Sequence, residues 1–286
     1  MNNLQIKSLT GIPVEKIQEA FVDAFSEYEV PIVMPLEKLK EMMVTRDLNP
    51  DWSVGCFDGE KLVGFILTGY REINEQKVCY DGGTGIIKTY QRKGIGELIL
   101  KTWIQKLKEK QIGSIVLEVL ENNIPAINLY EKYGFTKTRK LHCFEIEKQN
   151  LQSVPDRGFG ISVAIPAKII ENEDKYRLFT PTWQNANRSI LNVNENYTGV
   201  TLSCSGRVLC NGYVHKTKGN IPQVGILEDW KQWGLEAHLI NELAKHTESN
   251  KLLVLNVEEN NYLAETLMKL GFINFVNQFE MILKYN

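Results

Sequence analysis

One short stretch constrains the fold of this chain more than any other feature, and it runs from Gly85 to Glu97. It begins as an apolar strand end, passes through a basic turn that contains Gly94 and Gly96, and continues into a periodic segment. The apolar residues of that segment recur at i, i+3, i+4 and i+7, which places them on one face of a helix. They are Leu100, Trp103, Ile104 and Leu107. The sequence therefore predicts a strand, a glycine-containing loop and a helix in direct succession.

The loop has the properties of an anion site. The first backbone N–H groups of a helix lack intrahelical partners and carry partial positive charge, so they attract phosphate. Glycine lets a ligand approach these groups closely, and Arg92 and Lys93 add full positive charge. A Walker loop would end in Gly-Lys-Ser/Thr, and a dinucleotide fingerprint would have a third glycine where Ile99 stands. Neither pattern is present, so a different phosphate loop is predicted.

Two motifs carry a resemblance to a known family. Residues 91–96 match Gln/Arg-x-x-Gly-x-Gly/Ala, the pyrophosphate loop of the GNAT superfamily of acyl-CoA-dependent N-acyltransferases. About thirty residues later, the segment from Asn123 to Phe135 matches the family pattern Asn-x-x-Ala-x-x-Leu-Tyr-x-x-x-Gly-Phe, with Tyr130 at the tyrosine. Because both motifs occur in the right order and at the right separation, the chain resembles a GNAT N-acetyltransferase.

The resemblance implies a cosubstrate and roles for individual residues. Acetyl-CoA is expected as cosubstrate, without a metal. A backbone N–H near Ile86 or Ile87 would polarise the thioester carbonyl as an oxyanion hole does, Asn123 would hydrogen-bond the cofactor arm, and Tyr130 would protonate the departing thiolate. The expected cofactor-binding residues are Ile86, Ile87, Gln91, Arg92, Lys93, Gly94, Ile95, Gly96 and Asn123.

The base that deprotonates the amine is not singled out by the sequence. Asp81, Glu118 and Glu121 are candidates, although for each residue taken alone a solvated or loop-capping carboxylate is the favoured interpretation. We select Asp81 as a catalytic residue, and Glu118 and Tyr28 as residues that contact the amine acceptor. Tyr28 belongs to a group of apolar residues at a helix break, which could also be core. The acceptor itself, a small molecule or a protein amine, is not identified.

A cysteine nucleophile is the competing chemistry. His142 and Cys143 are adjacent in the sequence, but neighbouring residues on a strand point to opposite faces, so they cannot pair as base and nucleophile there. The five cysteines form no CxxC pair, and the four histidines are widely scattered. Free buried thiols and no metal are therefore expected.

The order of elements predicts a mixed α/β fold. A strand, two helices, three strands, a helix, a strand, a helix and a strand follow one another, which is also the order of a GNAT domain. The expected ranges are 4–9, 13–28, 35–46, 53–57, 62–69, 77–87 with a break at 81–83, 96–107, 115–120, 125–133 and 140–147. This first domain is placed at residues 1–148, before a polar stretch at 149–155.

The second domain, residues 155–286, is a degenerate GNAT-like repeat of the first, in which the two motifs are altered. Gly225 and Gly234 stand at the positions of Gly85 and Gly94, at the same offset, and Asn260 mirrors Asn123. Glu236, however, replaces Gly96 with bulk and negative charge, and Leu267 at the Tyr130 position has no proton to donate. We therefore expect this domain not to bind CoA productively. It would complete the acceptor cleft or form an oligomer interface, in a homodimer for example.

Composition limits the remaining classes of function. Lys and Arg total 33 against 35 Asp and Glu. The chain therefore has no net positive charge that would attract nucleic acid nonspecifically, and a nucleic-acid-binding function is disfavoured. Neither a leader-like N-terminus nor an apolar run of membrane-spanning length is present, which predicts a soluble cytoplasmic protein. The expected reaction is direct acetyl transfer from acetyl-CoA to a primary amine in a ternary complex. A non-catalytic CoA-binding regulatory or scaffold protein is the alternative.

Overall fold

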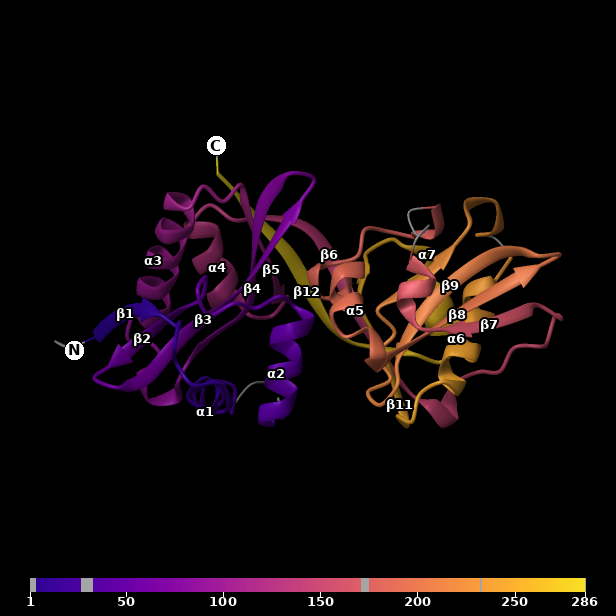
Figure 1. Ribbon diagram of the computed structural model, residues 1–286, viewed down its shortest axis with the longest axis horizontal. Coiled ribbons are helices and arrows are strands. Elements are labelled where there is room, and N and C mark those ends of the chain that lie inside the picture. The colour runs from indigo at the N-terminus through magenta and orange to yellow at the C-terminus, as the bar shows by residue number, and fades with distance from the viewer. Residues whose placement is uncertain (1–3, 27–32, 171–174, 232, 286) are drawn as a thin grey trace. The chain divides into compact units, whose positions relative to one another are not determined.

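The computed structural model describes residues 4–26, 33–170, 175–231 and 233–285. The chain forms two compact units, and Figure 1 follows it through both by colour. The first unit comprises residues 1–119, 123–138 and 280–286, and the second comprises 120–122 and 139–279. This division differs from the expected 1–148 and 155–286, because residues 139–148 belong to the second unit and residues 280–286 belong to the first.

Two long strands cause this difference. Strands β6 (Thr136–Glu147) and β12 (Ile273–Lys284) each begin in one unit and end in the other. In the first unit, the end of β12 is followed by Tyr285, whose amide donates to the carbonyl of Gly113 at 3.0 Å. In the second unit, β6 pairs antiparallel with β11 (Lys251–Glu258). The chain therefore passes between the units within β6 and β12, and not at the polar stretch after Gln149.

The first unit contains a mixed sheet, as the sequence predicts. Strands β1 (Leu4–Ser8), β2 (Val54–Asp58), β3 (Lys61–Ile73), β4 (Gln76–Ile86) and β5 (Ser114–Leu120) are neighbours in this order. The β4–β5 pair is parallel and the other three pairs are antiparallel. The irregularity expected at residues 81–83 is present as a register shift opposite Leu67 and Thr68, but it does not interrupt β4, which is one strand there.

The helices of the first unit cover both faces of this sheet (Figure 1). They are α1 (Val14–Ala24), α2 (Leu36–Thr45), α3 (Ile95–Glu109) and α4 (Ile124–Lys132). Phe65 of β3 stacks on Phe21 of α1 with ring centroids 5.8 Å apart, whereas a Cβ on the preceding Gly64 would lie 2.8 Å from Ile99 of α3. Successive strand residues face opposite sides, so α1 and α3 pack on opposite faces.

Helix α3 is fixed to the sheet by the apolar face that the sequence predicts. Trp103 is fully buried, and its indole N–H donates to the Thr68 hydroxyl on β3 at 2.8 Å. The indole thus keeps a partner where water is excluded. The other buried residues of this face are Ile95, Ile99, Leu100 and Leu107.

The second unit repeats the order of elements in the first, except that its described residues form one α-helix, α5, between the first two strands where the first unit has α1 and α2. Its antiparallel sheet has the strand order β10-β9-β8-β7, and leucines of α6 pack on it in an apolar core. The strands are β7 (Gly160–Ala164), β8 (Tyr197–Cys204), β9 (Arg207–His215) and β10 (Gln223–Ile226), and the α-helices are α5 (Asn187–Asn192), α6 (Leu235–Lys245) and α7 (Tyr262–Lys269). Short 3-10 helices occur at Lys88–Tyr90 (η1), Lys148–Asn150 (η2), Pro166–Lys168 (η3), Trp183–Asn185 (η5), Asn194–Asn196 (η6) and Glu228–Trp230 (η7).

The backbone supports the internal repeat. Gly94 precedes α3 with φ 77°, and Gly234 precedes α6 with φ 68°. One correspondence needs correction, because Asn261 and not Asn260 caps α7, accepting from the Leu263 amide at 3.0 Å. Within the described ranges, no helix has both the length and the apolar character that crossing a membrane requires.

Candidate active site

Strands β4 and β5 separate at the centre of the first unit. Their parallel pairing runs from Val78 and Ser114 to Asp81 and Leu117 and then stops, although β4 continues to Ile86 and stays paired with β3. Residues 82–86 therefore have an edge that faces away from β3, here called the outer edge of β4. Among the described residues, no β-bridge forms on this edge.

The outer edge presents the amide of Ile86 and not that of Ile87. The Ile87 amide donates to the carbonyl of Val63 at 3.0 Å, so it is already engaged by β3. In an antiparallel pair, successive residues direct their N–H groups to opposite sides, and Ile86 therefore points away from β3. Of the two amides expected to polarise a thioester, only Ile86 has the required direction.

The loop after β4 ends in an uncapped helix N-terminus. Gly94 has φ 77° and no side chain caps α3. The first backbone bond into this end comes from Leu98, which donates to the Gly94 carbonyl at 3.1 Å. In the described part of the chain, the amides of residues 95–97 donate to no backbone carbonyl. A Cβ on Gly96 would meet only Leu129, at 3.9 Å, so there is open space beside Gly96 in the first turn of α3.

The side chains of the loop divide into two groups. Gln91 donates to the Ile86 carbonyl at 3.1 Å and Lys93 donates to the Thr89 carbonyl at 2.7 Å, so both fold back on the loop. Arg92 is exposed and has φ 58°, a left-handed conformation that the sequence did not predict for a residue other than glycine. The Ile95 side chain is buried, which leaves only its backbone for a ligand.

Tyr130 and Asp81 meet beneath the separation of the strands. The buried Tyr130 hydroxyl donates to Asp81 Oδ2 at 3.0 Å, and its ring packs against Phe135 edge-on at 5.4 Å. Asp81 also accepts from the Thr84 hydroxyl at 2.6 Å and from the Gly83 amide at 3.0 Å. Asn123 caps α4 by accepting from the Ala126 amide at 3.3 Å. The second sequence motif therefore reaches β4 through one hydrogen bond to Asp81.

Burial controls the ionisation of Asp81. Loss of water raises the pKa of Asp81 above its ordinary value, and this exceeds the opposing effect of hydrogen bonds from Thr84, Tyr130 and Gly83. The folded protein thus binds this proton more tightly than the unfolded chain does. The resulting stabilisation is present below the ordinary pKa and is lost as the pH rises through the raised one.

This linkage predicts a pH-dependent effect of Asp81→Asn. The asparagine does not titrate, so the stability of the natural protein relative to Asp81→Asn should fall as the pH is raised from about 4 towards neutrality. Urea unfolding of both proteins across this range measures the difference. A difference that stays constant with pH would mean that Asp81 has an unshifted pKa in the folded state.

Glu118 lies on the opposite face of the sheet from Asp81. Asp81 and Leu117 are register partners, and the next residue, Glu118, points the other way. There it accepts from the Tyr80 hydroxyl at 2.5 Å, and burial raises the pKa of Tyr80 well above the ordinary value. The third carboxylate candidate, Glu121, is held by Lys140 at 2.6 Å. Tyr28, expected at the acceptor site, lies outside the described residues.

Thr84 and Tyr80 are the site residues that sequence reasoning missed. Thr84 donates a hydrogen bond to Asp81, and Tyr80 donates one to Glu118; both carboxylates were candidates from the sequence. Thr84 reaches Asp81, three residues away, because a bulge brings both side chains to one face. The run Asp81-Gly82-Gly83 is the signal for that bulge, since glycine in a strand often marks one.

Comparison with protein families gives a match over the first unit. The acetyltransferase (GNAT) family model matches residues 14–135. N-alpha-acetyltransferase 30 of Dictyostelium discoideum is 34% identical over 150 residues, which are 49% of this chain and 80% of that protein. The [ribosomal protein bS18]-alanine N-acetyltransferase of Haemophilus influenzae is 36% identical over 111 residues, 35% of this chain and 75% of that protein.

A solved structure matches over both units. The chain is similar in fold to a tandem GNAT protein from the clavulanic acid biosynthesis pathway, with a TM-score of 0.68 and 13% identity. The match covers 99% of this chain and 98% of that one. At this identity the likeness shows a shared fold, and it extends the acetyltransferase architecture to the second unit.

Proposed function

Because the chain belongs to the GNAT family and is an acyl-CoA-dependent N-acetyltransferase, we propose that its first unit transfers acetyl from acetyl-CoA directly to a primary amine. The outer edge of β4, beside Tyr130, carries this proposal. The pantetheine arm lies along that edge, and the Ile86 amide polarises the thioester carbonyl. The pyrophosphate is bound by the amides of residues 95–97, at the positive end of α3.

Acid and base act from opposite faces of the sheet. Tyr130, on the α4 side, donates its proton to the sulfur as CoA leaves, since its hydroxyl hydrogen can rotate away from Asp81. Glu118, on the other side, takes the proton of the attacking amine directly or through water. Asp81, the partner of Tyr130, lies on the same face of the sheet as Leu117, whereas Glu118 points to the other face. A thioester placed between β4 and β5 would therefore have the acid Tyr130 on one side and the base Glu118 on the other.

Asp81 acts as a positioning residue for Tyr130 and not as the base. Its carboxylate already accepts from three donors, on Tyr130, Thr84 and Gly83, and it is 6% exposed. Both of its oxygens are therefore already engaged by donors of the protein itself, one of which is the Tyr130 hydroxyl. The contact instead fixes where the Tyr130 oxygen lies.

The left-handed conformation of Arg92 gives a prediction that separates stability from binding. A residue other than glycine is destabilised by about 1–2 kcal/mol at φ 58°, and glycine avoids this cost. Glycine in turn loses about 0.5–1 kcal/mol of stability because its unfolded chain is freer. Arg92→Gly should therefore leave stability equal or raise it by up to about 1.5 kcal/mol. Loss of a charge near phosphate should weaken acetyl-CoA binding about fivefold.

Arg92→Ala is the matched control for this prediction. It removes the same charge but keeps a Cβ in the left-handed region, so it should weaken binding equally without the gain in stability. Denaturant unfolding and calorimetry on both variants measure the two effects. Equal affinity in all three proteins would remove Arg92 from the phosphate site.

The reaction is tested by release of CoA thiol. The purified chain is mixed with acetyl-CoA and a panel of primary amines that includes peptides with different N-termini and the polyamine spermine. The similarity to an N-alpha-acetyltransferase and to a [ribosomal protein bS18]-alanine N-acetyltransferase motivates the peptides, and the probable spermine N(1)-acetyltransferase of Bacillus subtilis subsp. natto motivates the polyamine. Amine-dependent thiol release is expected with at least one class. Tight acetyl-CoA binding without release for any amine would favour a non-catalytic CoA-binding protein.

A further inference from the structure

The second unit contains the same structural framework as the proposed cofactor site. Its Leu227 amide donates to the Leu209 carbonyl at 2.9 Å, just as Ile87 donates to Val63 in the first unit. Strand β10 then leads through η7 to Gly234 and α6. The edge of β10 that faces away from β9 therefore corresponds to the outer edge of β4.

Strands β10 and β11 also begin together and then separate. Asn220 and Leu253 form a parallel bridge just before β10, and the Ile221 amide donates to the Leu253 carbonyl at 2.8 Å. Beyond this point, β10 pairs only with β9 among the named strands of the described chain. The Asn220–Leu253 bridge of the second unit corresponds to the Tyr80–Val116 pair of the first, so both pairs of strands separate at equivalent positions.

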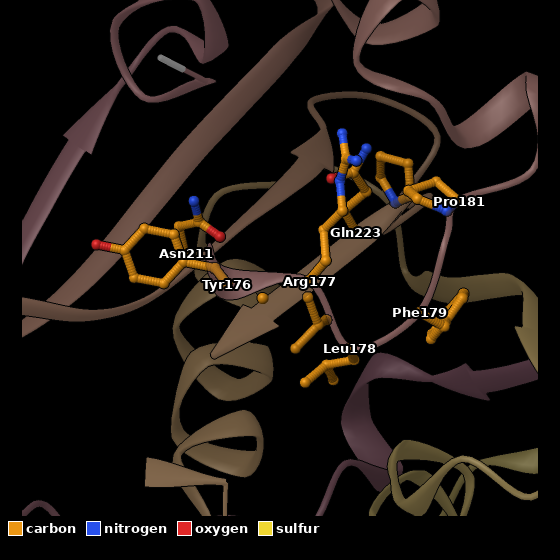
Figure 2. Close-up of a pocket in the computed structure, with 10 residues that line it drawn as sticks. Tyr176, Arg177, Leu178, Phe179, Pro181, Asn211 and Gln223 are labelled. Carbon is orange, nitrogen blue, oxygen red and sulfur yellow. The ribbon is translucent and has the colours of Figure 1, made fainter. Parts of the chain in front are cut away.

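In the second unit, however, the chain itself occupies this edge. Arg177 forms an antiparallel β-bridge with Gly225, the counterpart of Gly85. The contact is close, because a Cβ on Gly225 would lie 2.9 Å from the Tyr176 Cβ and 3.1 Å from the Tyr176 carbonyl oxygen. Figure 2 shows Tyr176, Arg177 and Leu178 in this region, with Asn211 and Gln223. The remaining cavity is about 20 Å³, room for about one water molecule.

The segment is also held from the β11 side. The Asn261 amide group donates to the Leu178 carbonyl at 3.1 Å, from the position that Asn123 occupies in the first unit. Asn256 donates to the Thr182 hydroxyl at 3.0 Å, and both of these residues are buried. Residues 176–182, here called the inserted segment, are therefore anchored on both sides of the separation.

We propose that the inserted segment is a permanent internal ligand of the second unit, occupying the edge that a pantetheine arm would need. Its backbone pairs with β10 as an added strand does in peptide recognition, and Asn261 binds it as a cofactor-arm asparagine would. Glu236 closes the phosphate end, where it is 5% exposed and accepts from Thr266 at 2.9 Å. The chain therefore binds one acetyl-CoA. This inference rests on the proposed function of the first unit.

Two reciprocal substitutions test the number of sites by calorimetry with acetyl-CoA. The natural chain should bind one equivalent. Gly96→Glu gives the first unit the residue of the second and should bind none. Glu236→Gly gives the second unit the glycine of the first and should still bind one, because the inserted segment remains. Glu236→Ala serves if the glycine variant is not folded by circular dichroism.

Hydrogen exchange identifies what occupies the second site. Amides of residues 176–178 and 224–226 should be protected without ligand and unchanged by saturating acetyl-CoA. Two equivalents bound by Glu236→Gly, one by Gly96→Glu, or loss of protection on adding acetyl-CoA would each overturn the proposal. No binding to the natural chain, with protection intact, would instead contradict the function proposed for the first unit and leave the internal ligand standing.

Discussion

Replacing Tyr130 with phenylalanine is expected to lower kcat by about 10²–10⁴-fold and to change the Kd for acetyl-CoA little. The variant keeps the ring, which packs edge-on against Phe135, so α4 should stay in place. It loses only the hydroxyl that donates to Asp81 and would protonate the departing thiolate. Steady-state kinetics and calorimetry on the same preparation measure the two quantities.

Tyr70→Phe is the matched control for this substitution. Tyr70 also donates its hydroxyl to a carboxylate, that of Glu72, at 2.9 Å, but it lies on β3 before the hairpin and outside the proposed site. The control should retain kcat. If Tyr130→Phe also retained kcat, Tyr130 would have no role as the acid, and a water molecule or the amine product would have to supply the proton.

Glu118→Gln should be the second variant with a large loss, again about 10²–10⁴-fold in kcat near neutral pH. A glutamine has a similar shape and can still accept from Tyr80, but it cannot take the proton of an ammonium group. The deficit should narrow as the pH is raised towards the pKa of the acceptor amine, because the amine then loses its proton to solvent. A pH profile of both proteins checks this dependence.

Glu121→Gln supplies the corresponding control. Its carboxylate forms an ion pair with Lys140 and accepts from Asn277 at 3.0 Å, and exposed pairs contribute at most about 1 kcal/mol. Activity close to that of the natural protein is expected. A Glu118→Gln variant that matched it at every pH would eliminate Glu118 as the base.

The part of the site that is local in sequence could be predicted, and the part that depends on distant contacts could not. Gly94 and Gly96 were expected at a helix start, where the structure places them, and Tyr130 was expected from the resemblance of a short contiguous motif to the GNAT family. The contact between Tyr130 and Asp81 spans 49 residues and depends on a bulge that decides which face Asp81 takes. The direction of the Ile86 amide likewise depends on pairing with β3, which no local pattern encodes.

The crossing of β6 and β12 from one unit to the other could not be predicted for the same reason. The polar residues after Gln149 suggested a boundary, because linkers are usually polar. A strand that continues past a boundary has the same alternating pattern on both sides, so β6 gave no sign of crossing it. The inserted segment was equally invisible, since Arg177 makes an isolated bridge and a single bridge leaves no periodicity in the sequence.

Because β12 crosses between the units, the first unit can be completed only late in synthesis. The hydroxyl of Tyr285, the residue after β12, donates to the Ile104 carbonyl at 2.7 Å, and Thr138 donates to the carbonyl of Glu280 at 3.2 Å. These contacts join an early part of the nascent polypeptide to one translated much later. These contacts of the first unit can form only after residues 280–285 have left the ribosomal exit tunnel, and a chain truncated before β12 would lack them.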